Sequence, residues 1–254
     1  MKLPSTPSFS LKNKRALIVG ASSGIGLACA VALAEYGASI TIAARRTQKL
    51  EELSNSLESK NIAVELLELD ISKTNKTLQI INDLDPFDVL VNSAGMAKHS
   101  YSVETKEADF DDVMGINLKG AYFLTMAVAK RLMSAKKSGS LINISSQMGL
   151  VGGQDRAVYS ASKHAVEGFT KSIAIELGSA DIRVNTICPT FILTDLTKPT
   201  FEDPEKIAWI KSKIKLGRVG KVEDIMGAVV FLASDASSLI TGSSLVIDGG
   251  WTAE

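Results

Sequence analysis

Short apolar runs alternate with segments of helical spacing along most of this chain. Such runs are typical of strands that helices cover on both faces of a parallel sheet. We expect strands at Arg15–Val19, Ser39–Ala43, Val64–Leu69, Asp88–Asn92, Ser140–Ser145, Ile182–Cys188 and Ser244–Asp248. We expect helices at Gly24–Tyr36, Thr47–Ser59, Lys106–Ala135, Ala157–Leu177, Pro204–Lys215 and Val222–Ala233.

The order strand, helix, strand predicts an α/β fold of the doubly wound, Rossmann type. Helical connections give right-handed crossovers, a mostly parallel seven-stranded sheet and helices on both faces. No linker divides the chain, so we expect one domain over residues 12–254 after a loose tail over residues 1–11. Ligands bind such sheets beyond the carboxyl ends of the strands. The loops of interest therefore follow Val19, Ala43, Leu69, Asn92, Ser145 and Cys188.

Composition excludes several classes of protein. The 28 Lys and Arg residues balance the 28 Asp and Glu residues, which leaves no overall field to hold nucleic acid or an anionic membrane. No apolar run reaches the roughly 18 residues of a membrane-spanning helix. Cys29 and Cys188 are too few for a disulfide framework and indicate free, buried thiols in a reducing compartment. The expected location is therefore the cytoplasm.

A glycine-rich turn follows the first predicted strand. Gly20, Gly24 and Gly26 allow a tight turn and a close approach of the backbone to a pyrophosphate, at the positive end of the next helix. A helix-start turn with purely structural glycines is the alternative. The place between the first strand and the first helix favours dinucleotide binding.

The end of the second predicted strand bears on the choice of cofactor. An NAD site usually has an acidic residue here that binds the ribose hydroxyl. This chain has Ala44, Arg45 and Arg46 instead. Guanidinium groups pair with phosphate oxygens, so NADP(H) is favoured and NAD(H) stays possible. Two solvated arginines at a helix start are the alternative.

Together with these features, motifs in chain order make the sequence resemble the short-chain dehydrogenase/reductase family over roughly residues 12–251. Three positions differ from the family pattern: Val19 replaces Thr, Ser93 replaces Asn, and Thr190 replaces Gly. The motifs are the glycine turn, Asn92-Ser93-Ala94-Gly95, the helical Asn117, the strand-end Ser145-Ser146, Tyr159-x-x-x-Lys163, Arg183-Val184-Asn185 and Asp248-Gly249-Gly250.

The resemblance implies an oxidoreductase that interconverts a carbonyl and a secondary alcohol, with Tyr159 as acid and base. Tyr159 and Lys163 share a helix face, and an ammonium beside a phenol is expected to lower the pKa of the phenol. The family places its catalytic serine at Ser146, with Ser145 in support, and Asn117 binds a water that links Lys163 to solvent. A surface Tyr–Lys pair, or a sensor that keeps the fold without catalysis, is the alternative.

The resemblance also implies a cofactor site and an assembly. Asp70 and Ile71 flank adenine, Ile192 and Thr194 meet the carboxamide, and Lys163 holds the nicotinamide ribose. The family assembles as a homotetramer, with a homodimer as the fallback. The full predicted cofactor set is Gly20, Ser22, Ser23, Gly24, Ile25, Gly26, Arg45, Arg46, Asp70, Ile71, Asn92, Ala94, Gly95, Tyr159, Lys163, Pro189, Ile192 and Thr194.

The sequence leaves the small-molecule substrate open among sugar acids and polyols, 3-oxoacyl thioesters, and ketones. His99 is interpreted as a solvated loop residue, with the mouth of the substrate site as the alternative, and His164 as lying off the catalytic face. Two isolated histidines without a close Cys or carboxylate cluster argue against a metal site. Lys98, Arg156 and Lys198 would favour an anionic substrate but are interpreted as solvated charges. Candidate pocket residues are Met96, His99, Met148, Leu150, Gln154, Phe191, Leu196 and Trp209.

Overall fold

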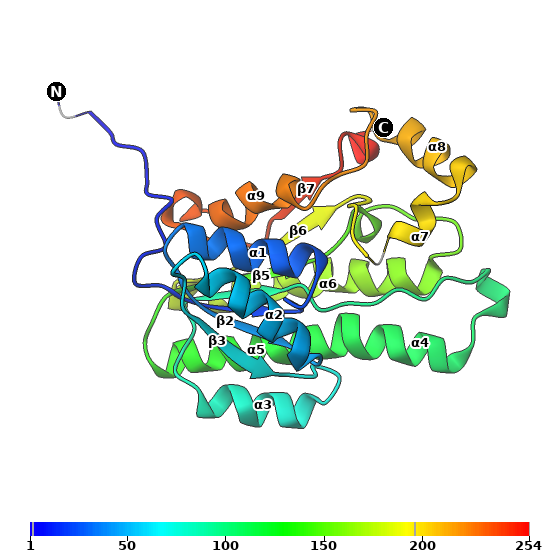
Figure 1. Cartoon of the computed structure of the whole chain (residues 1–254). Coiled ribbons are helices and arrows are strands. Elements are labelled where there is room, and N and C mark those ends of the chain that lie inside the picture. The colour runs from blue at the N-terminus through cyan, green and yellow to red at the C-terminus, as the bar shows by residue number, and fades with distance from the viewer. Residues whose placement is uncertain (2, 196, 254) are drawn as a thin grey trace.

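The computed structural model describes residues 1, 3–195 and 197–253, and its seven strands form one parallel sheet (Figure 1). The strand order is β3-β2-β1-β4-β5-β6-β7, which confirms the doubly wound fold. The strands are β1 (Arg15–Val19), β2 (Ser39–Ala44), β3 (Val64–Glu68), β4 (Val89–Asn92), β5 (Gly139–Ile144), β6 (Ile182–Pro189) and β7 (Ser244–Ile247).

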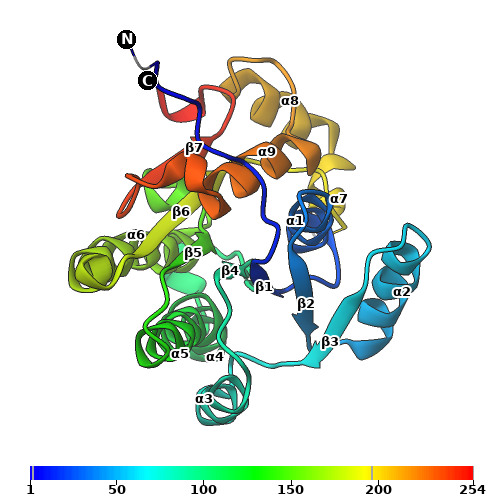
Figure 2. The ribbon, with the colours of Figure 1, turned by 90° about the vertical axis from the view of Figure 1, so that its left-hand side faces the viewer.

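Helices cover both faces of the sheet. Figure 2 shows α1, α2 and α9 on one side and α3, α4, α5 and α6 on the other. The α-helices are α1 (Gly24–Glu35), α2 (Thr47–Glu58), α3 (Thr74–Asp83), α4 (Glu107–Met114), α5 (Ala121–Ser134), α6 (Ala157–Leu177), α7 (Lys198–Phe201), α8 (Pro204–Lys213) and α9 (Glu223–Ala233). No described helix is long and apolar enough to cross a membrane.

The core consists of two apolar layers, one on each side of the sheet, and β1 serves both. Ala16 and Ile18 belong to the layer that includes α1 and α9, whereas Leu17 and Val19 belong to the layer that includes α5 and α6. Successive side chains of a strand point to opposite faces. A strand buried on both faces therefore has an unbroken apolar run, which is why β1 was recognisable from the sequence.

Three features differ from the sequence-based expectation. The expected helix over Lys106–Ala135 is interrupted by a π-helical turn, η2 (Gly115–Gly120). The helices α3 and α7 had not been assigned from the pattern, because few of their residues are buried. Leu11, expected in the loose tail, is fully buried, and its N–H donates to the Tyr36 carbonyl at 2.8 Å.

Candidate active site

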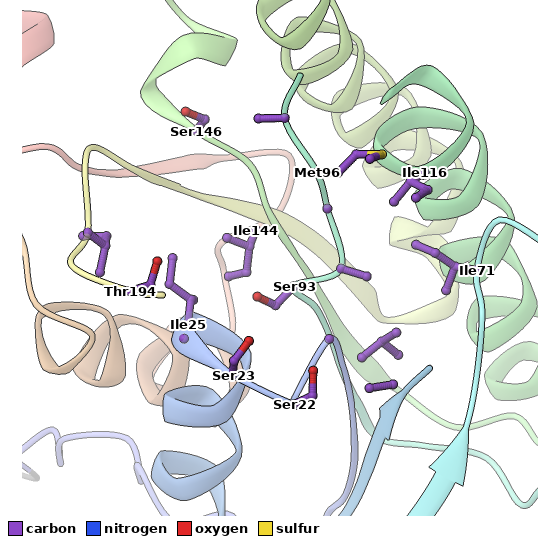
Figure 3. A pocket seen from close by; sticks show the side chains of 18 of the residues that line it. Ser22, Ser23, Ile25, Ile71, Ser93, Met96, Ile116, Ile144, Ser146 and Thr194 are labelled. Atoms are coloured by element: carbon purple, nitrogen blue, oxygen red, sulfur yellow. The ribbon is translucent and has the colours of Figure 1, made fainter. Parts of the chain in front are cut away.

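A cavity of about 320 Å³ opens at the carboxyl ends of the central strands. This is the edge where the sheet topology places a ligand, because the connections from the neighbouring β1 and β4 diverge there. Figure 3 looks into the cavity, with Ser22, Ser23 and Ile25 on one side and Ile71 and Ile116 on the other.

The glycine turn forms one wall of this cavity, and its glycines are sterically required. A Cβ atom at Gly20, where φ is +84°, would lie 2.7 Å from the Ala94 nitrogen. A Cβ atom at Gly26 would lie 2.2 Å from the Gly20 carbonyl oxygen. Gly26 thus permits the close packing of the turn against α1 and does not itself line the cavity.

The amino end of α1 is free to receive an anion. Ser23 is the N-cap residue, yet its side chain forms no capping hydrogen bond, and the first turn contains no acidic residue. Uncapped N–H groups at the positive end of a helix are suited to a phosphate. Together with the close backbone approach at Gly20, this arrangement fits the pyrophosphate of a dinucleotide.

Two arginines stand at the end of β2, on the wall of the same cavity. The Arg46 Nη2 donates to the Ser22 hydroxyl at 2.9 Å and to the Ser23 hydroxyl at 3.3 Å. Arg45 has no hydrogen bond or ion pair among the described residues, so its guanidinium is available to a ligand. Ala44 lines the cavity where an NAD site would have its acid.

Tyr159 lies on α6 and lines the cavity close to Ser146. Burial raises the pKa of the Tyr159 phenol, whereas the Ser146 hydroxyl and the Arg156 guanidinium lower it. The pKa of this phenol in the empty protein is therefore raised overall, whereas the sequence predicted a lowered one. The cation whose charge acts on this phenol is Arg156, which precedes it on the chain by three residues.

Lys163 is buried beneath the cavity, with 5% of its surface exposed. Its Nζ donates to the Ile144 carbonyl at 2.9 Å and lies 5.7 Å from the centre of the Tyr159 ring. Burial lowers the pKa of the Lys163 ammonium to about 8. The ammonium is thus charged at neutral pH, in a setting that disfavours the charge.

Asn117 lies in the π-helical turn η2, and its side chain does not line the cavity. The Oδ1 atom accepts from the Met96 N–H at 2.8 Å, and Nδ2 donates to the Met96 carbonyl at 2.9 Å and to the Ser162 hydroxyl at 3.1 Å. Both amide hydrogens are therefore used. This side chain joins the loop after β4 to α6, and the predicted water link to Lys163 stays a prediction.

A second cavity of about 210 Å³ adjoins the first. The two share Ser146 and Tyr159 in their linings, together with Ala97, Thr190 and Thr197. The rest of the second lining comes from His99, Gln147, Met148, Arg156, Phe191 and Thr200. A dinucleotide in the first cavity would thus face a small molecule in the second across the serine and the tyrosine.

Comparison with known proteins agrees with this arrangement. A family model described as enoyl-(acyl carrier protein) reductase matches residues 20–252. A 3-oxoacyl-[acyl-carrier-protein] reductase of Chlamydia trachomatis is 39% identical, with 94% of this chain and 98% of that protein covered. The chain belongs to the short-chain dehydrogenase/reductase family. It is accordingly an oxidoreductase of the carbonyl–alcohol class, as the sequence predicted.

Two solved structures of this family are closely similar. One, assigned as a 2-deoxy-D-gluconate 3-dehydrogenase of Agrobacterium tumefaciens with bound NADP, is 39% identical, with a TM-score of 0.91 and coverage of 97% of this chain and 99% of that one. The other is a gluconate 5-dehydrogenase of Burkholderia cenocepacia in complex with NADP and tartrate. It is 31% identical, with a TM-score of 0.93 and coverage of 97% and 98%. Both neighbours were crystallised with bound NADP, which agrees with the cofactor predicted for this chain.

The structure brings most of the residues predicted from the family pattern to the two cavities. Gly26, Asn92 and Asn117 do not line either one. Asn92 instead supports the loop, because its Oδ1 accepts from the Ala94 N–H at 3.2 Å and its Nδ2 donates to Asn143 at 3.1 Å. The predicted residues in the lining are Gly20, Ser22, Ser23, Gly24, Ile25, Arg45, Arg46, Asp70, Ile71, Ala94, Gly95, Ser146, Tyr159, Lys163, Pro189, Ile192 and Thr194.

The substrate side was predicted less well. Of the candidate residues, His99, Met148 and Phe191 line the second cavity and Met96 lines the first. Leu150, Gln154 and Trp209 line neither, and Leu196 lies outside the described residues.

Charged residues near the substrate side divide into two kinds. Lys98 forms ion pairs with Asp109 at 2.6 Å and with Asp112 at 2.7 Å, and Lys198 is exposed on α7. Arg156 and His99, both interpreted as solvated, instead line the second cavity, which corrects that interpretation. Gln147 was missed altogether, although its place next to Ser146 was a usable signal.

Proposed function

We propose that this protein is an NADP(H)-dependent oxidoreductase that interconverts a secondary alcohol and a ketone in a compact, polar substrate. The observation that carries the proposal is the junction of the two cavities at Ser146 and Tyr159. The similar structures bind NADP, and Arg45 is the group available here for its 2′-phosphate. The second cavity has about seven water volumes of space, which favours a compact metabolite over a long acyl chain, and Gln147, Arg156 and Thr190 in its lining offer hydrogen-bonding groups.

The protein's own part in this chemistry is positioning and proton transfer. When bound, the nicotinamide takes the hydride that the alcohol carbon loses, or returns it to the carbonyl carbon, which balances the two electrons. Ser146 donates a hydrogen bond to the substrate oxygen. The Tyr159 phenol donates its proton to that oxygen during reduction, and its phenolate accepts the hydroxyl proton during oxidation.

Burial favours the protonated form of Tyr159, so the resting site is prepared to donate a proton. Lys163, charged below its pKa of about 8, supplies a buried positive charge beside the ring. The serine, the tyrosine and the lysine are therefore proposed as the catalytic residues, with Asn117 as a positioning residue.

The proposal is tested with NADP⁺ and NADPH against a panel of sugar acids, polyols, 3-oxoacyl thioesters and simple ketones, followed at the reduced-nicotinamide absorbance. We expect turnover with NADP(H) and with at least one compact polar substrate. Tight binding of NADP(H) without turnover of any panel member would favour the non-catalytic sensor. Preference for long acyl thioesters would contradict the assignment of a compact substrate.

We further propose that the protein acts as a homotetramer in the cytoplasm. Exposed apolar side chains lie on the two long helices of one face, including Tyr122 and Phe123 on α5 and Ile175 on α6. The Tyr122 ring contacts Phe123 at 5.4 Å and Phe169 of α6 at 5.7 Å, so these three rings span the two helices. Two buried free thiols support a reducing compartment.

A further inference from the structure

The second cavity contains a cation, Arg156, that no carboxylate of the described residues contacts. Arg156 is half-buried at the amino end of α6, and it forms no ion pair within the part of the chain that the structure describes. The lining of this cavity contains no Asp or Glu. Asp155 precedes Arg156 on the chain but is exposed and does not line the cavity. The charge of Asp155 raises the pKa of Arg156 without an ion pair, so no carboxylate contacts the guanidinium on the substrate side.

Neutral neighbours hold this guanidinium in place. Its Nη1 donates to the His99 Nε2 at 2.5 Å, and its carbon lies 5.2 Å from the centre of the Phe191 ring. The Phe191 ring in turn stacks on Trp251 at 5.7 Å. Burial and the charge of Arg156 lower the pKa of His99 to about 4, so this imidazole is a neutral acceptor at physiological pH. Of the five N–H groups of Arg156, the described residues engage one, at Nη1.

Burial makes the charged form of Arg156 energetically unfavourable in the empty protein. Burial lowers the pKa of Arg156, and the charges of Tyr159 and Asp155 offset only part of this effect. A bound anion would remove that cost, since a guanidinium and a carboxylate form strong, paired hydrogen bonds.

Unpartnered polar groups surround the same space. Gln147 is 1% exposed and lines the second cavity, yet neither its Oε1 nor its Nε2 has a hydrogen-bond partner in the structure. The Thr190 hydroxyl is also buried without a partner, and it lines both cavities. A buried amide that no protein group pairs is costly, so these side chains are suited to hydrogen-bond a polar ligand in the cavity.

We propose that the substrate is a polyhydroxylated carboxylic acid, with its carboxylate bound by Arg156 and its hydroxyl groups bound by Gln147 and Thr190. This inference rests on the proposed function, because it assigns the substrate class of the same site. Arg156 is the specificity-determining residue, and His99 and Phe191 position it. The reacting hydroxyl lies at Ser146 and Tyr159, which border the same cavity.

Equilibrium binding to the NADP⁺-loaded protein tests the anchor without requiring turnover. The probes are two matched pairs, gluconate against sorbitol and tartrate against threitol, in which each acid is compared with its uncharged alcohol. We expect Arg156→Gln to weaken binding of the tighter acid by about 10–150-fold, the range of a charge-assisted hydrogen bond, and to change polyol binding less than about threefold. The affinity of Arg156→Lys for the acid is expected to lie between those of wild type and Arg156→Gln, because lysine keeps the positive charge but lacks the two-pronged geometry of the guanidinium.

Lys76→Gln is the matched control, since it removes one positive charge from exposed α3, away from both cavities. Retention of the far-ultraviolet spectrum and Tm shows that each variant is folded. The anchor is overturned if neither acid binds wild type more tightly than its polyol, or if Arg156→Gln weakens acid and polyol equally. The latter result would mean that Arg156 acts through Tyr159 rather than on a carboxylate.

Kinetics separate this inference from the proposed function. Turnover of polyols or ketones with kcat/KM no lower than that of acids would leave the oxidoreductase standing and remove the carboxylate anchor. Acid binding that depends on Arg156, with no turnover of any panel member, would leave the anchor standing and remove the proposed function.

Discussion

At the scale of single residues, the site depends on how burial changes the pKa values of three ionisable side chains. Tyr159 is kept protonated, Lys163 is kept charged against its preference, and Arg156 is kept without a carboxylate. The two buried cations cost free energy in the empty protein, whereas the neutral phenol is the form that burial favours, and each of the three groups has a use once ligands are present. Strongly perturbed groups that gather in one cleft are typical of functional sites.

Tyr159→Phe keeps the ring and removes the transferable proton. We expect turnover to fall by about 10²–10⁴-fold while the affinity for NADP(H) changes little. Steady-state assays and cofactor fluorescence titration measure the two effects.

Ser146→Ala should lower turnover more than Ser145→Ala, because Ser146 borders both cavities and Ser145 borders only the first. Near-normal turnover of the phenylalanine variant, or the reverse serine ranking, would contradict these roles.

Lys163→Met should stabilise the empty protein at pH 7 and abolish turnover. The pKa of Lys163 is lowered from 10.5 to about 8, so its charged form costs about 3 kcal/mol below pH 8. Loss of the hydrogen bond to Ile144 offsets part of this gain in stability, which leaves a net stabilisation of about 1–2 kcal/mol. Each kcal/mol raises Tm by about 2–4 °C in a protein of this size.

The stability difference between wild type and Lys163→Met is expected to depend on pH. The cost of the charge is fully present below the folded pKa of about 8 and disappears as the pH rises toward the unfolded value of 10.5. Thermal unfolding of wild type and Lys163→Met should therefore differ most at pH 7 and converge by pH 10. A difference that does not depend on pH would show that packing, not charge, separates the two proteins.

Arg45→Ala should weaken NADP(H) by about 10–150-fold and hardly change NAD(H), because only the phosphate needs the free guanidinium. The loss should shrink as salt is added. Arg46→Ala is the comparison, since Arg46 already braces Ser22 and Ser23 and its loss should weaken both cofactors. Equal losses for both cofactors in Arg45→Ala would mean that the 2′-phosphate is bound elsewhere.

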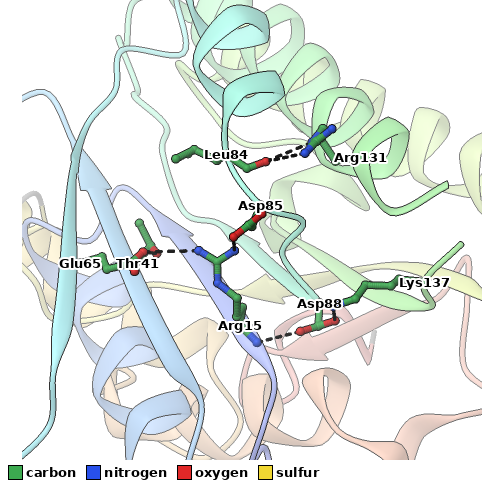
Figure 4. A network of polar contacts seen from close by, with 8 residues as sticks. All are labelled: Arg15, Thr41, Glu65, Leu84, Asp85, Asp88, Arg131 and Lys137. Atoms are coloured by element: carbon green, nitrogen blue, oxygen red, sulfur yellow. Dashed lines mark hydrogen bonds and ion pairs between the residues drawn. The ribbon is translucent and has the colours of Figure 1, made fainter. Parts of the chain in front are cut away.

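At the scale of elements, the amino ends and the carboxyl ends of the strands have different roles. Figure 4 shows polar contacts at the amino ends of the strands, where Arg15 lies 3.5 Å from Glu65 and 3.8 Å from Asp85, and its N–H donates to Asp88 at 2.8 Å. These contacts tie β1 to β3 and to the segment before β4. The carboxyl ends carry the glycine turn and the two cavities instead.

The glycine turn permits an element-scale prediction. Gly26→Ala places a Cβ atom 2.2 Å from the Gly20 carbonyl, so the turn must open. We expect weaker binding of NADP(H) and NAD(H) alike, because the backbone contacts to the pyrophosphate are common to both. Gly227→Ala, at an exposed position of α9, is the control, as its Cβ atom meets no neighbour within 4 Å. We expect this control to bind the cofactor as wild type does, with a Tm at or above that of wild type. A Gly26→Ala protein with normal cofactor affinity would contradict the steric argument.

At the scale of the whole molecule, the patch on α5 and α6 is expected to join copies of the chain. Light scattering should give about four times the 27.0 kDa of the monomer. Phe123→Lys, together with Ile175→Lys, should shift the assembly toward smaller species, because a charge in an apolar interface is costly. Lys76→Gln serves again as a surface control. A wild-type protein that scatters as a monomer at micromolar concentration would contradict the proposed assembly.

Periodicity and local motifs by themselves determined the strand–helix alternation, the glycine turn and the Tyr159–Lys163 spacing. Each of these depends on residues close together in the chain, so its physical meaning is visible in the pattern. The strands are apolar because both faces are buried, and the turn contains glycine because no Cβ fits there.

Only the tertiary structure decided the surroundings of the active site. Arg156 meets His99, which is 57 residues away, and Asn117 meets Met96 and Ser162 from separate elements. A solvated charge and a buried cation have the same letter in the sequence. The difference between them is the desolvation and the partners that other segments bring, and these exist only once the chain has folded.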